Sequence, residues 1–185
     1  MKTGLGIYKK YRIARAFISL LRFELKKRLV GFDVANLYLQ RVDKYALVMI
    51  LKKNGAQIGE NCDIETGLAF HNCRNYKNLA IGDNCHIGKQ CFFDLKDKIS
   101  IQNNVTISMR CSFLTHTDVG SSVLKKKYPK SLQPIVINSN CYLGASVTLL
   151  QGAWLEEKTF VAAGALCKGR ISAGKRIGGI PAKEI

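Results

Sequence analysis

The chain has 185 residues, the usual length of one domain, and its 47% hydrophobic and 23% charged residues are typical of a soluble globular protein. The formal net charge of +16 predicts a polyanionic partner: nucleic acid, an acidic membrane or a phosphorylated small molecule. No apolar run approaches the roughly 20 residues needed to cross a bilayer. No cleavable signal peptide is recognised and the seven cysteines are an odd number, so we expect a reducing, cytoplasmic location.

Residues 1–54 are predicted to form a basic amphipathic helical segment. Between residues 7 and 53 the apolar residues have helical spacing, and one stripe consists of Ile7, Tyr11, Ala14, Ile18, Leu21, Leu25 and Leu29. Gly31 is expected to end the first helix, and Asp33 to cap a second helix that runs to about Leu51. Residues 1–30 contain nine Lys or Arg and one acid, Glu24. This composition predicts contact with an anionic membrane, or packing of the stripe on the following domain or on an oligomer.

Residues 55–185 repeat with a period of six. Units such as IGENCD, IGDNCH, IGKQCF and INSNCY begin with a large apolar residue, continue with Gly or a polar residue, and have a small residue in the fifth place. A fixed period of this kind predicts a solenoid of short stacked strands, three to a coil. Five cysteines occupy the fifth place and are expected to be compact inward residues: Cys62, Cys85, Cys91, Cys111 and Cys141. No Cys-x-x-Cys pair occurs, so no zinc site is predicted.

Three features of the second half of the chain accompany the repeat. They are a histidine just before a loop, the aromatic-x-Gly sequence at Tyr142–Gly144, and the ending Gly-x-Pro-Ala-Lys at Gly179–Lys183. Over about residues 55–185 the chain resembles the left-handed β-helix acyltransferases with hexapeptide repeats, above all the galactoside, maltose and polysaccharide O-acetyltransferases. The resemblance implies a mainly β fold, a left-handed parallel β-helix after an N-terminal α-helical segment. It also implies a homotrimer that transfers an acetyl group from acetyl-CoA to a hydroxyl of a sugar or glycan, without a metal.

The unit FLTHTD interrupts the repeat at His116. Phe113 and Ile137, which begin units on either side, are 24 residues apart, a multiple of six, so the loop 117–134 is expected to leave and rejoin the coils in register. An imidazole titrates near neutral pH, as a general base requires. The resemblance gives His116 this role, in a cleft between two subunits.

Other residues are candidates for the acceptor site. The resemblance places Asp94 beside acceptor hydroxyls, and Asp118 is a candidate to orient the imidazole. His71, in a disturbed unit, is the rival base, because serine acetyltransferases carry theirs in a comparable earlier coil. His86 is expected to be a surface residue, and the spacing of the three histidines does not predict a metal site.

The resemblance also implies where coenzyme A binds. Its phosphates are expected beside basic residues of the last coils, and its pantetheine arm along small residues. The candidates are Tyr142, Ala145, Ala163, Gly164, Lys168, Arg170, Lys175, Arg176 and Lys183. Gly169 stands where related enzymes often have Lys, so whether Lys168 or Arg170 meets phosphate is left open.

Two other classes of function remain as alternatives. One is a serine acetyltransferase-like enzyme or a sugar-nucleotide N-acetyltransferase, and the other is a non-catalytic trimeric β-helix that binds phosphorylated ligands or membranes. Nucleic-acid binding is not predicted, because the basic residues lack an aromatic stacking cluster or a reading helix. The identity of the acceptor is not predicted by the sequence.

Overall fold

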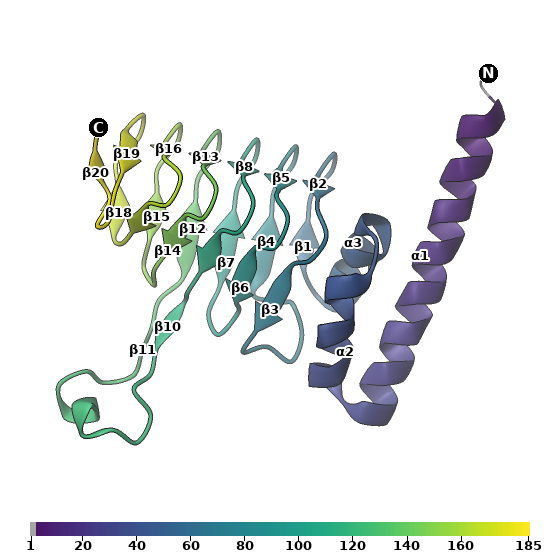
Figure 1. The fold of residues 1–185 in the computed structure, drawn as a ribbon, viewed down its shortest axis with the longest axis horizontal. Helices are drawn as coiled ribbons and strands as arrows, with labels where there is room; N and C mark the ends of the chain where they lie inside the picture. The colour runs from purple at the N-terminus through teal and green to yellow at the C-terminus, as the bar shows by residue number, and fades with distance from the viewer. Residues whose placement is uncertain (1–2) are drawn as a thin grey trace.

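The computed structural model describes residues 3–185, with side chains from residue 10 onward. An N-terminal group of helices is followed by a parallel β-solenoid from which one long loop projects (Figure 1). The predicted fold class is therefore confirmed. Residues 1–2 of the predicted basic segment lie outside the described residues, as do the side chains of Ile7 and Lys9.

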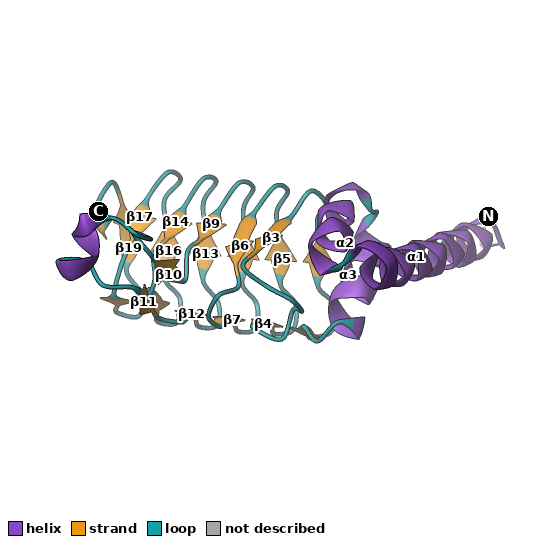
Figure 2. Cartoon of the chain, turned by 90° about the horizontal axis from the view of Figure 1, so that it is seen from below, coloured by secondary structure: helices purple, strands orange, loops and turns teal. Residues whose placement is uncertain are grey.

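The solenoid consists of about six coils whose strands form three parallel sheets. The first sheet contains β1 (Gln57–Ile58), β4 (Leu79–Ile81), β7 (Ile99–Ile101), β12 (Ile135–Ile137), β15 (Trp154–Leu155) and β18 (Arg170–Ile171). The second contains β2 (Asp63–Ile64), β5 (His86–Ile87), β8 (Thr106–Ile107), β13 (Tyr142–Leu143), β16 (Phe160–Val161), β19 (Arg176–Gly178) and the antiparallel β20 (Lys183–Glu184). The third contains β3 (Ala69–His71), β6 (Phe92–Asp94), β9 (Ser112–Phe113), β14 (Thr148–Leu149) and β17 (Leu166–Cys167). Figure 2 shows the coils stacked along one axis.

The pairing of the strands confirms the predicted period and its phase. Residues in the first place of a unit lie opposite one another on successive coils, as Ile58 does with Ile81. Ile101 pairs directly with Ile137, so the solenoid continues without a change of register across the intervening loop. That loop projects as an antiparallel ribbon of β10 (His116–Thr117) and β11 (Ser131–Leu132), with a 3₁₀ turn, η2 (Val123–Lys126), at its tip.

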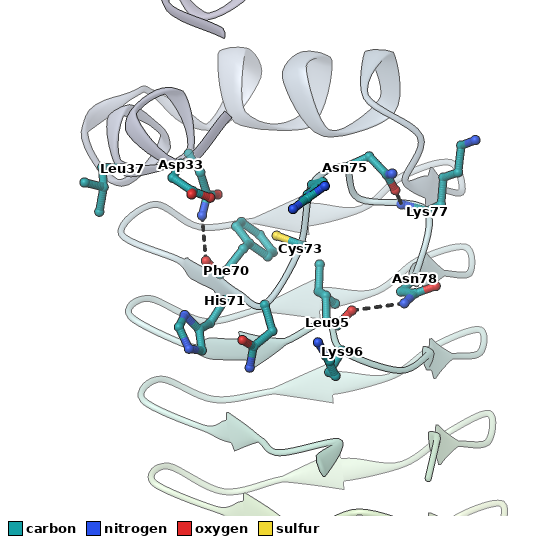
Figure 3. Close-up of a pocket in the computed structure, with 13 residues that line it drawn as sticks. Asp33, Leu37, Phe70, His71, Cys73, Asn75, Lys77, Asn78, Leu95 and Lys96 are labelled. Atoms are coloured by element: carbon teal, nitrogen blue, oxygen red, sulfur yellow. Dashed lines mark hydrogen bonds between the residues drawn. The ribbon is translucent and has the colours of Figure 1, made fainter. Parts of the chain in front are cut away.

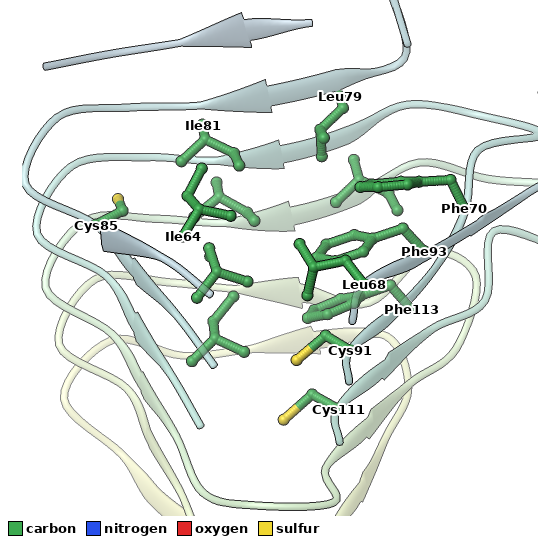
Figure 4. Close-up of a cluster of buried hydrophobic side chains, with 14 of the residues drawn as sticks. Ile64, Leu68, Phe70, Leu79, Ile81, Cys85, Cys91, Phe93, Cys111 and Phe113 are labelled. Carbon is green, nitrogen blue, oxygen red and sulfur yellow. The ribbon is translucent and has the colours of Figure 1, made fainter. Parts of the chain in front are cut away.

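The first-place residues fill the interior. Phe70, Phe93 and Phe113 stack along the inside of the third sheet, with ring centroids 5.5 and 4.8 Å apart (Figure 4). Each of these rings is buried, and burying a Phe side chain stabilises a protein by about 1.5–3 kcal/mol. The third sheet therefore owes much of its stability to this aromatic stack.

Two other places of the unit are set by the backbone. The fourth place has a positive φ in coil after coil, as at Asn61 (54°), Asn84 (55°) and Asn140 (63°), which explains the Asn and Gly residues there because these tolerate the left-handed conformation. At the second position of the unit, the backbone of the next coil lies very close to the chain. A Cβ added to Gly144 would lie 2.5 Å from the backbone nitrogen of Ala163, so only glycine fits without a shift.

The cysteines in the fifth place are structural. The thiols of Cys85, Cys111 and Cys141 lie 2.9, 3.2 and 3.1 Å from backbone carbonyls of the next coil. All seven cysteines are free, and those at positions 85, 91, 111, 141 and 167 are buried. The fifth-place thiols thus act as small groups that donate to a backbone carbonyl at a corner of the coil.

The N-terminal helices differ from the prediction in one respect. The first helix, α1 (Thr3–Val30), ends before Gly31, as expected. The second predicted helix is divided into α2 (Phe32–Tyr38), the 3₁₀ turn η1 (Leu39–Arg41) and α3 (Lys44–Lys53). Asp33 makes no cap, and it is Asp43 whose side chain accepts the N–H groups of Tyr45 and Ala46 at 2.9 and 3.2 Å. The chain turns there because a carboxylate satisfies the free amides of the first helical turn.

The packing face of α1 is not the predicted stripe. Ala16 and Phe23 are buried against α2 and α3, whereas every described residue of the stripe is exposed. The helices close the first coil through aromatic contacts, since the Phe32 ring lies 6.2 Å from that of Phe23 and 5.4 Å from that of Tyr76. The predicted packing of the stripe on the following domain is therefore wrong.

Candidate active site

His116 lies where the projecting loop leaves the third sheet, and it pairs with a buried carboxylate. Its Nδ1 is 2.5 Å from Oδ2 of Asp94 on the preceding coil. Asp94 ends β6 and is 1% exposed, whereas 26% of the His116 side chain is exposed. One end of the imidazole is thus fixed inside the protein while the ring remains accessible.

Asp94 is held by a further set of hydrogen bonds. Asn72 donates its side-chain amide to Oδ1 at 2.8 Å, and Thr115 donates its backbone N–H to Oδ2 at 3.0 Å. Burial by itself raises the pKa of Asp94, but the hydrogen bonds from His116 and Asn72 outweigh it, so the pKa is lowered from the ordinary value of 3.8. The carboxylate is therefore ionised at neutral pH.

An ionised Asp94 decides the tautomer of His116. A carboxylate only accepts hydrogen bonds, so Nδ1 carries the proton and Nε2 carries the lone pair. A fixed imidazole with a free lone pair is the arrangement that proton abstraction from a hydroxyl requires. Asp94 thus positions the ring in the geometry of a general base.

A cleft of about 960 Å³ adjoins this pair on the side of the helices (Figure 3). Its walls come from α2, from the 72–78 segment that interrupts the first coil, and from Leu95 and Lys96. His71 lies at its edge and pairs in register with Asp94 in the third sheet. Asn72 lines the cleft and also bonds Asp94, so this residue connects the wall of the cleft to the histidine pair.

Asp118 and His86 each have other hydrogen-bond partners. Asp118 accepts the N–H of Gly120 at 2.8 Å and pairs with Lys130 at 3.0 Å, so it braces the loop, and the carboxylate bonded to His116 is Asp94. His86 lies on the second sheet, where its Nδ1 is 3.3 Å from Asp63. Among the described residues, no group of three or more His, Cys, Asp or Glu side chains is arranged to hold a metal ion.

The predicted coenzyme A residues lie on the last coils. Ala145 and Gly164 are neighbours, joined by a 2.8 Å backbone hydrogen bond, and the exposed ring of Tyr142 stacks on Phe160 at 4.8 Å. Of the cations, Arg170 pairs with Glu156 at 2.5 Å and Lys175 with Glu184 at 2.7 Å. The Arg176 guanidinium lies 5.5 Å from the Phe160 ring centroid, and Lys168, Lys183 and Ala163 are exposed.

Sequence reasoning missed Asn72 and Thr115, which hold Asp94 in place. Phe93 and Phe113 both begin a repeat unit and pair in register in the third sheet. The residues that follow them in the chain, Asp94 and Leu114, therefore lie on adjacent coils. Thr115 and His116 come next in the chain. This spacing was the available signal that Asp94 and His116 meet.

Comparisons with known proteins agree with this architecture. Residues 78–109 match the family described as "Hexapeptide repeat of succinyl-transferase". No curated protein matches the chain in sequence. A hexapeptide-repeat-containing acetyltransferase from Vibrio cholerae superposes with a TM-score of 0.70 at 19% identity, over 95% of this chain and 90% of that one. A maltose O-acetyltransferase from Clostridium difficile 630 gives 0.70 at 20% identity, over 90% and 86%.

A galactoside acetyltransferase in complex with coenzyme A gives a TM-score of 0.63 at 19% identity, over 95% of this chain and 80% of that one. At these identities the likeness establishes the fold. The chain therefore shares the fold of these proteins over most of its length.

Proposed function

We propose that this hexapeptide-repeat β-helix protein is an acetyltransferase that moves the acetyl group of acetyl-CoA to a hydroxyl of a sugar or glycan. The observation that carries the proposal is the 2.5 Å contact between His116 and the buried Asp94 at the base of the loop. The shared fold with acetyltransferases, one of them solved with acetyl-CoA and another with coenzyme A, supports the choice of donor.

In the proposed reaction the histidine moves one proton in two steps. Nε2 of His116 takes the proton of the acceptor hydroxyl as the oxygen attacks the thioester carbonyl carbon. The tetrahedral intermediate collapses with cleavage of the carbon–sulfur bond, and the proton passes from the imidazolium to the departing thiolate. Asp94 stabilises the imidazolium, and backbone N–H groups supply the donors for the oxyanion.

The donor is proposed to lie along the last coils. Ala145, Ala163 and Gly164 leave room for a thin pantetheine arm, with Tyr142 beside it. Lys168, Arg176 and Lys183 have no ion pair among the described residues, so they are the better partners for the phosphates. Arg170 and Lys175, which are paired, would first have to exchange Glu156 and Glu184 for phosphate oxygens.

The acceptor is proposed to occupy the cleft beside Asn72, with His71 at its edge and the loop of Asp118 above the imidazole. Three cations line this cleft, Arg74, Lys77 and Lys96, against one acid, Asp33. None of the three has an ion pair among the described residues. This charge favours an acceptor that carries a carboxylate or a phosphate over a neutral sugar.

The assembly and location proposed for the protein are a cytoplasmic homotrimer. A trimer would place the exposed loop and the accessible side of His116 against a second subunit, which closes the open cleft from water. Acetyl transfer to the hydroxyl of serine, or to the amino group of a sugar nucleotide, uses the same proton transfer and is the second candidate. In favour of it, an N-acyltransferase from Bacillus cereus shares the fold with a TM-score of 0.58.

The experiment is acetyl-CoA consumption measured against neutral sugars, carboxylated sugars, nucleotide sugars and serine. Replacement of His116 by Ala should lower turnover about 10²–10⁴-fold while coenzyme A binding, measured by calorimetry, is unchanged. His86→Ala is the matched control, because His86 also pairs with an aspartate but lies on another sheet, and its turnover should be normal.

Normal turnover in His116→Ala would overturn the assignment of the base. If the wild-type chain binds coenzyme A but consumes no acetyl-CoA with any acceptor, the non-catalytic binding function is the better conclusion. Alkaline treatment hydrolyses an acetyl ester but leaves an acetyl amide. The mass of the product after this treatment therefore distinguishes O-transfer from N-transfer.

A further inference from the structure

The outward face of α1 carries a continuous apolar stripe. Tyr11, Ile18, Leu21, Leu25 and Leu29 follow one another at spacings of seven, three, four and four residues, which places them on one side of a helix. All are exposed, Leu21 at 54%, Leu25 at 57% and Leu29 at 73%. A row of exposed apolar side chains usually marks a contact surface. Within the described chain the Arg15 guanidinium lies 5.7 Å from the Tyr11 ring centroid, at one end of the row.

Positive charges flank the stripe on both sides. Arg15 and Arg22 follow stripe positions by one residue, while Lys10 and Arg28 fall on the opposite border by helical geometry. All four side chains are exposed. Glu24, the one acid of α1, is already engaged by Lys27 at 2.6 Å and by Asn54 at 2.9 Å.

The position of α1 leaves this face open. α2 and α3 lie between α1 and the first coil, so the helix forms the outer end of the molecule (Figures 1 and 2). Its buried face, with Ala16 and Phe23, is turned toward these two helices. The stripe is therefore directed away from the solenoid.

We propose that this face of α1 docks on an anionic lipid surface, lying in the plane of the interface. An apolar row between two rows of cations matches a membrane whose acyl chains lie below acidic headgroups. A second copy of the chain fits less well, because it brings the same arginines to the contact and α1 offers it no unpaired acid. Among the described residues no helix has the length and hydrophobicity to cross the bilayer.

This inference is independent of the proposed acetyl transfer, since its test measures binding and not turnover. The probe is a vesicle of phosphatidylcholine, with or without phosphatidylglycerol at about one lipid in three, in a flotation assay of the full chain. The wild-type protein should float with the anionic vesicles only. Binding should weaken between about 0.05 and 0.5 M salt, because the Debye length shortens severalfold.

Two variants separate the charges from the stripe. Arg15→Gln/Arg22→Gln/Arg28→Gln should lower the partition coefficient about 100-fold, because each basic residue near an anionic surface contributes about 1 kcal/mol. Leu21→Gln/Leu25→Gln should lower it at least 10-fold, because each Leu loses apolar contact with the acyl chains. Circular dichroism checks that both variants remain folded.

The matched controls carry the same chemistry elsewhere. Lys89→Gln/Lys98→Gln/Lys158→Gln removes three exposed charges from the coils, and Val123→Gln/Leu124→Gln removes two exposed apolar residues from the tip of the loop. Both should bind like the wild type. Equal binding to neutral vesicles, no binding at low salt, or a loss in the controls as large as in the α1 variants would overturn the proposal. So would a fall in oligomer mass for Leu21→Gln/Leu25→Gln, which would assign the stripe to a protein interface.

Discussion

At the scale of single residues, the defining feature is a carboxylate that is buried, ionised and shared by four neighbours. Asp94 accepts hydrogen bonds from His116, Asn72, Thr115 and the backbone N–H of Lys96. A buried charge is tolerated in a protein only where it is paired and hydrogen-bonded. The same hydrogen bonds that stabilise the buried charge of Asp94 also fix the imidazole, so the stability of the fold and the proposed function depend on one group.

Asp94→Asn tests this dependence through catalysis. The amide can donate to Nδ1 and so move the proton of His116 to Nε2, which removes the lone pair needed for proton abstraction. We expect kcat to fall about 10²–10⁴-fold with little change in KM for the acceptor. Asp63→Asn is the control, because Asp63 is an exposed carboxylate that contacts His86, and its kcat should be normal.

Asp94→Asn should also change how the free energy of unfolding depends on pH. A carboxylate whose pKa is lowered in the folded protein stabilises it above the ordinary pKa of 3.8, and this contribution disappears as the pH falls through the lowered value. The wild-type protein should therefore exceed the variant in free energy of unfolding at pH 7, and the difference should shrink below about pH 4. Urea unfolding at both pH values measures it, and a difference independent of pH would contradict the ionised state of Asp94.

At the scale of the elements, the sequence predicts the coils well and the helices less well. A period of six has one phase in which large residues point inward. The inward orientation of Ile58, Phe93 and Ile137 could therefore be predicted from the sequence. The stripe on α1 was readable as a pattern, but this helix also has a second apolar face with Ala16 and Phe23. Periodicity alone does not say which of two apolar faces packs, because that depends on where α2 and α3 lie.

The Phe stack gives a prediction for one strand. Phe93 lies between Phe70 and Phe113, whereas its neighbour Phe92 points to the outside of the same strand and is partly exposed. Phe93→Ala should cost about 3–5 kcal/mol of unfolding free energy, because it leaves a cavity in the stack. Phe92→Ala should cost clearly less, and an equal loss in chemical denaturation would contradict the inward assignment of position 93.

At the scale of the whole molecule, the helical segment closes one end of a stack of coils. Solenoids need such a cap, because the last repeat would otherwise expose its interior face. Here Phe32 and Tyr76 pack at 5.4 Å over the first coil, and the Tyr76 hydroxyl donates to Asn36 at 3.0 Å. Composition predicted the basic surface of this segment, while its role as a cap depends on contacts between residues 40 or more apart.

Two truncations distinguish the cap from the rest of α1. Deletion of residues 1–54 uncovers Phe70 and Tyr76, so we expect aggregation and a loss of soluble protein. Deletion of residues 1–15 stops short of Ala16, the first buried residue of the described side chains. It removes the contact of Arg12 with the Tyr45 ring and should lower the thermal midpoint only slightly. Light scattering and thermal unfolding measure both, and a soluble, cooperatively unfolding 55–185 fragment would contradict the capping role.

The buried cysteines can report where the stack of coils opens transiently. Cys85, Cys111, Cys141 and Cys167 sit at successive levels of the stack, each closed to solvent, and burial raises the pKa of Cys167 to about 11. A buried thiol reacts with an alkylating reagent only while its own level of the stack is open to solvent. The labelling rate at each cysteine, read by mass spectrometry, would therefore show from which end the stack comes apart.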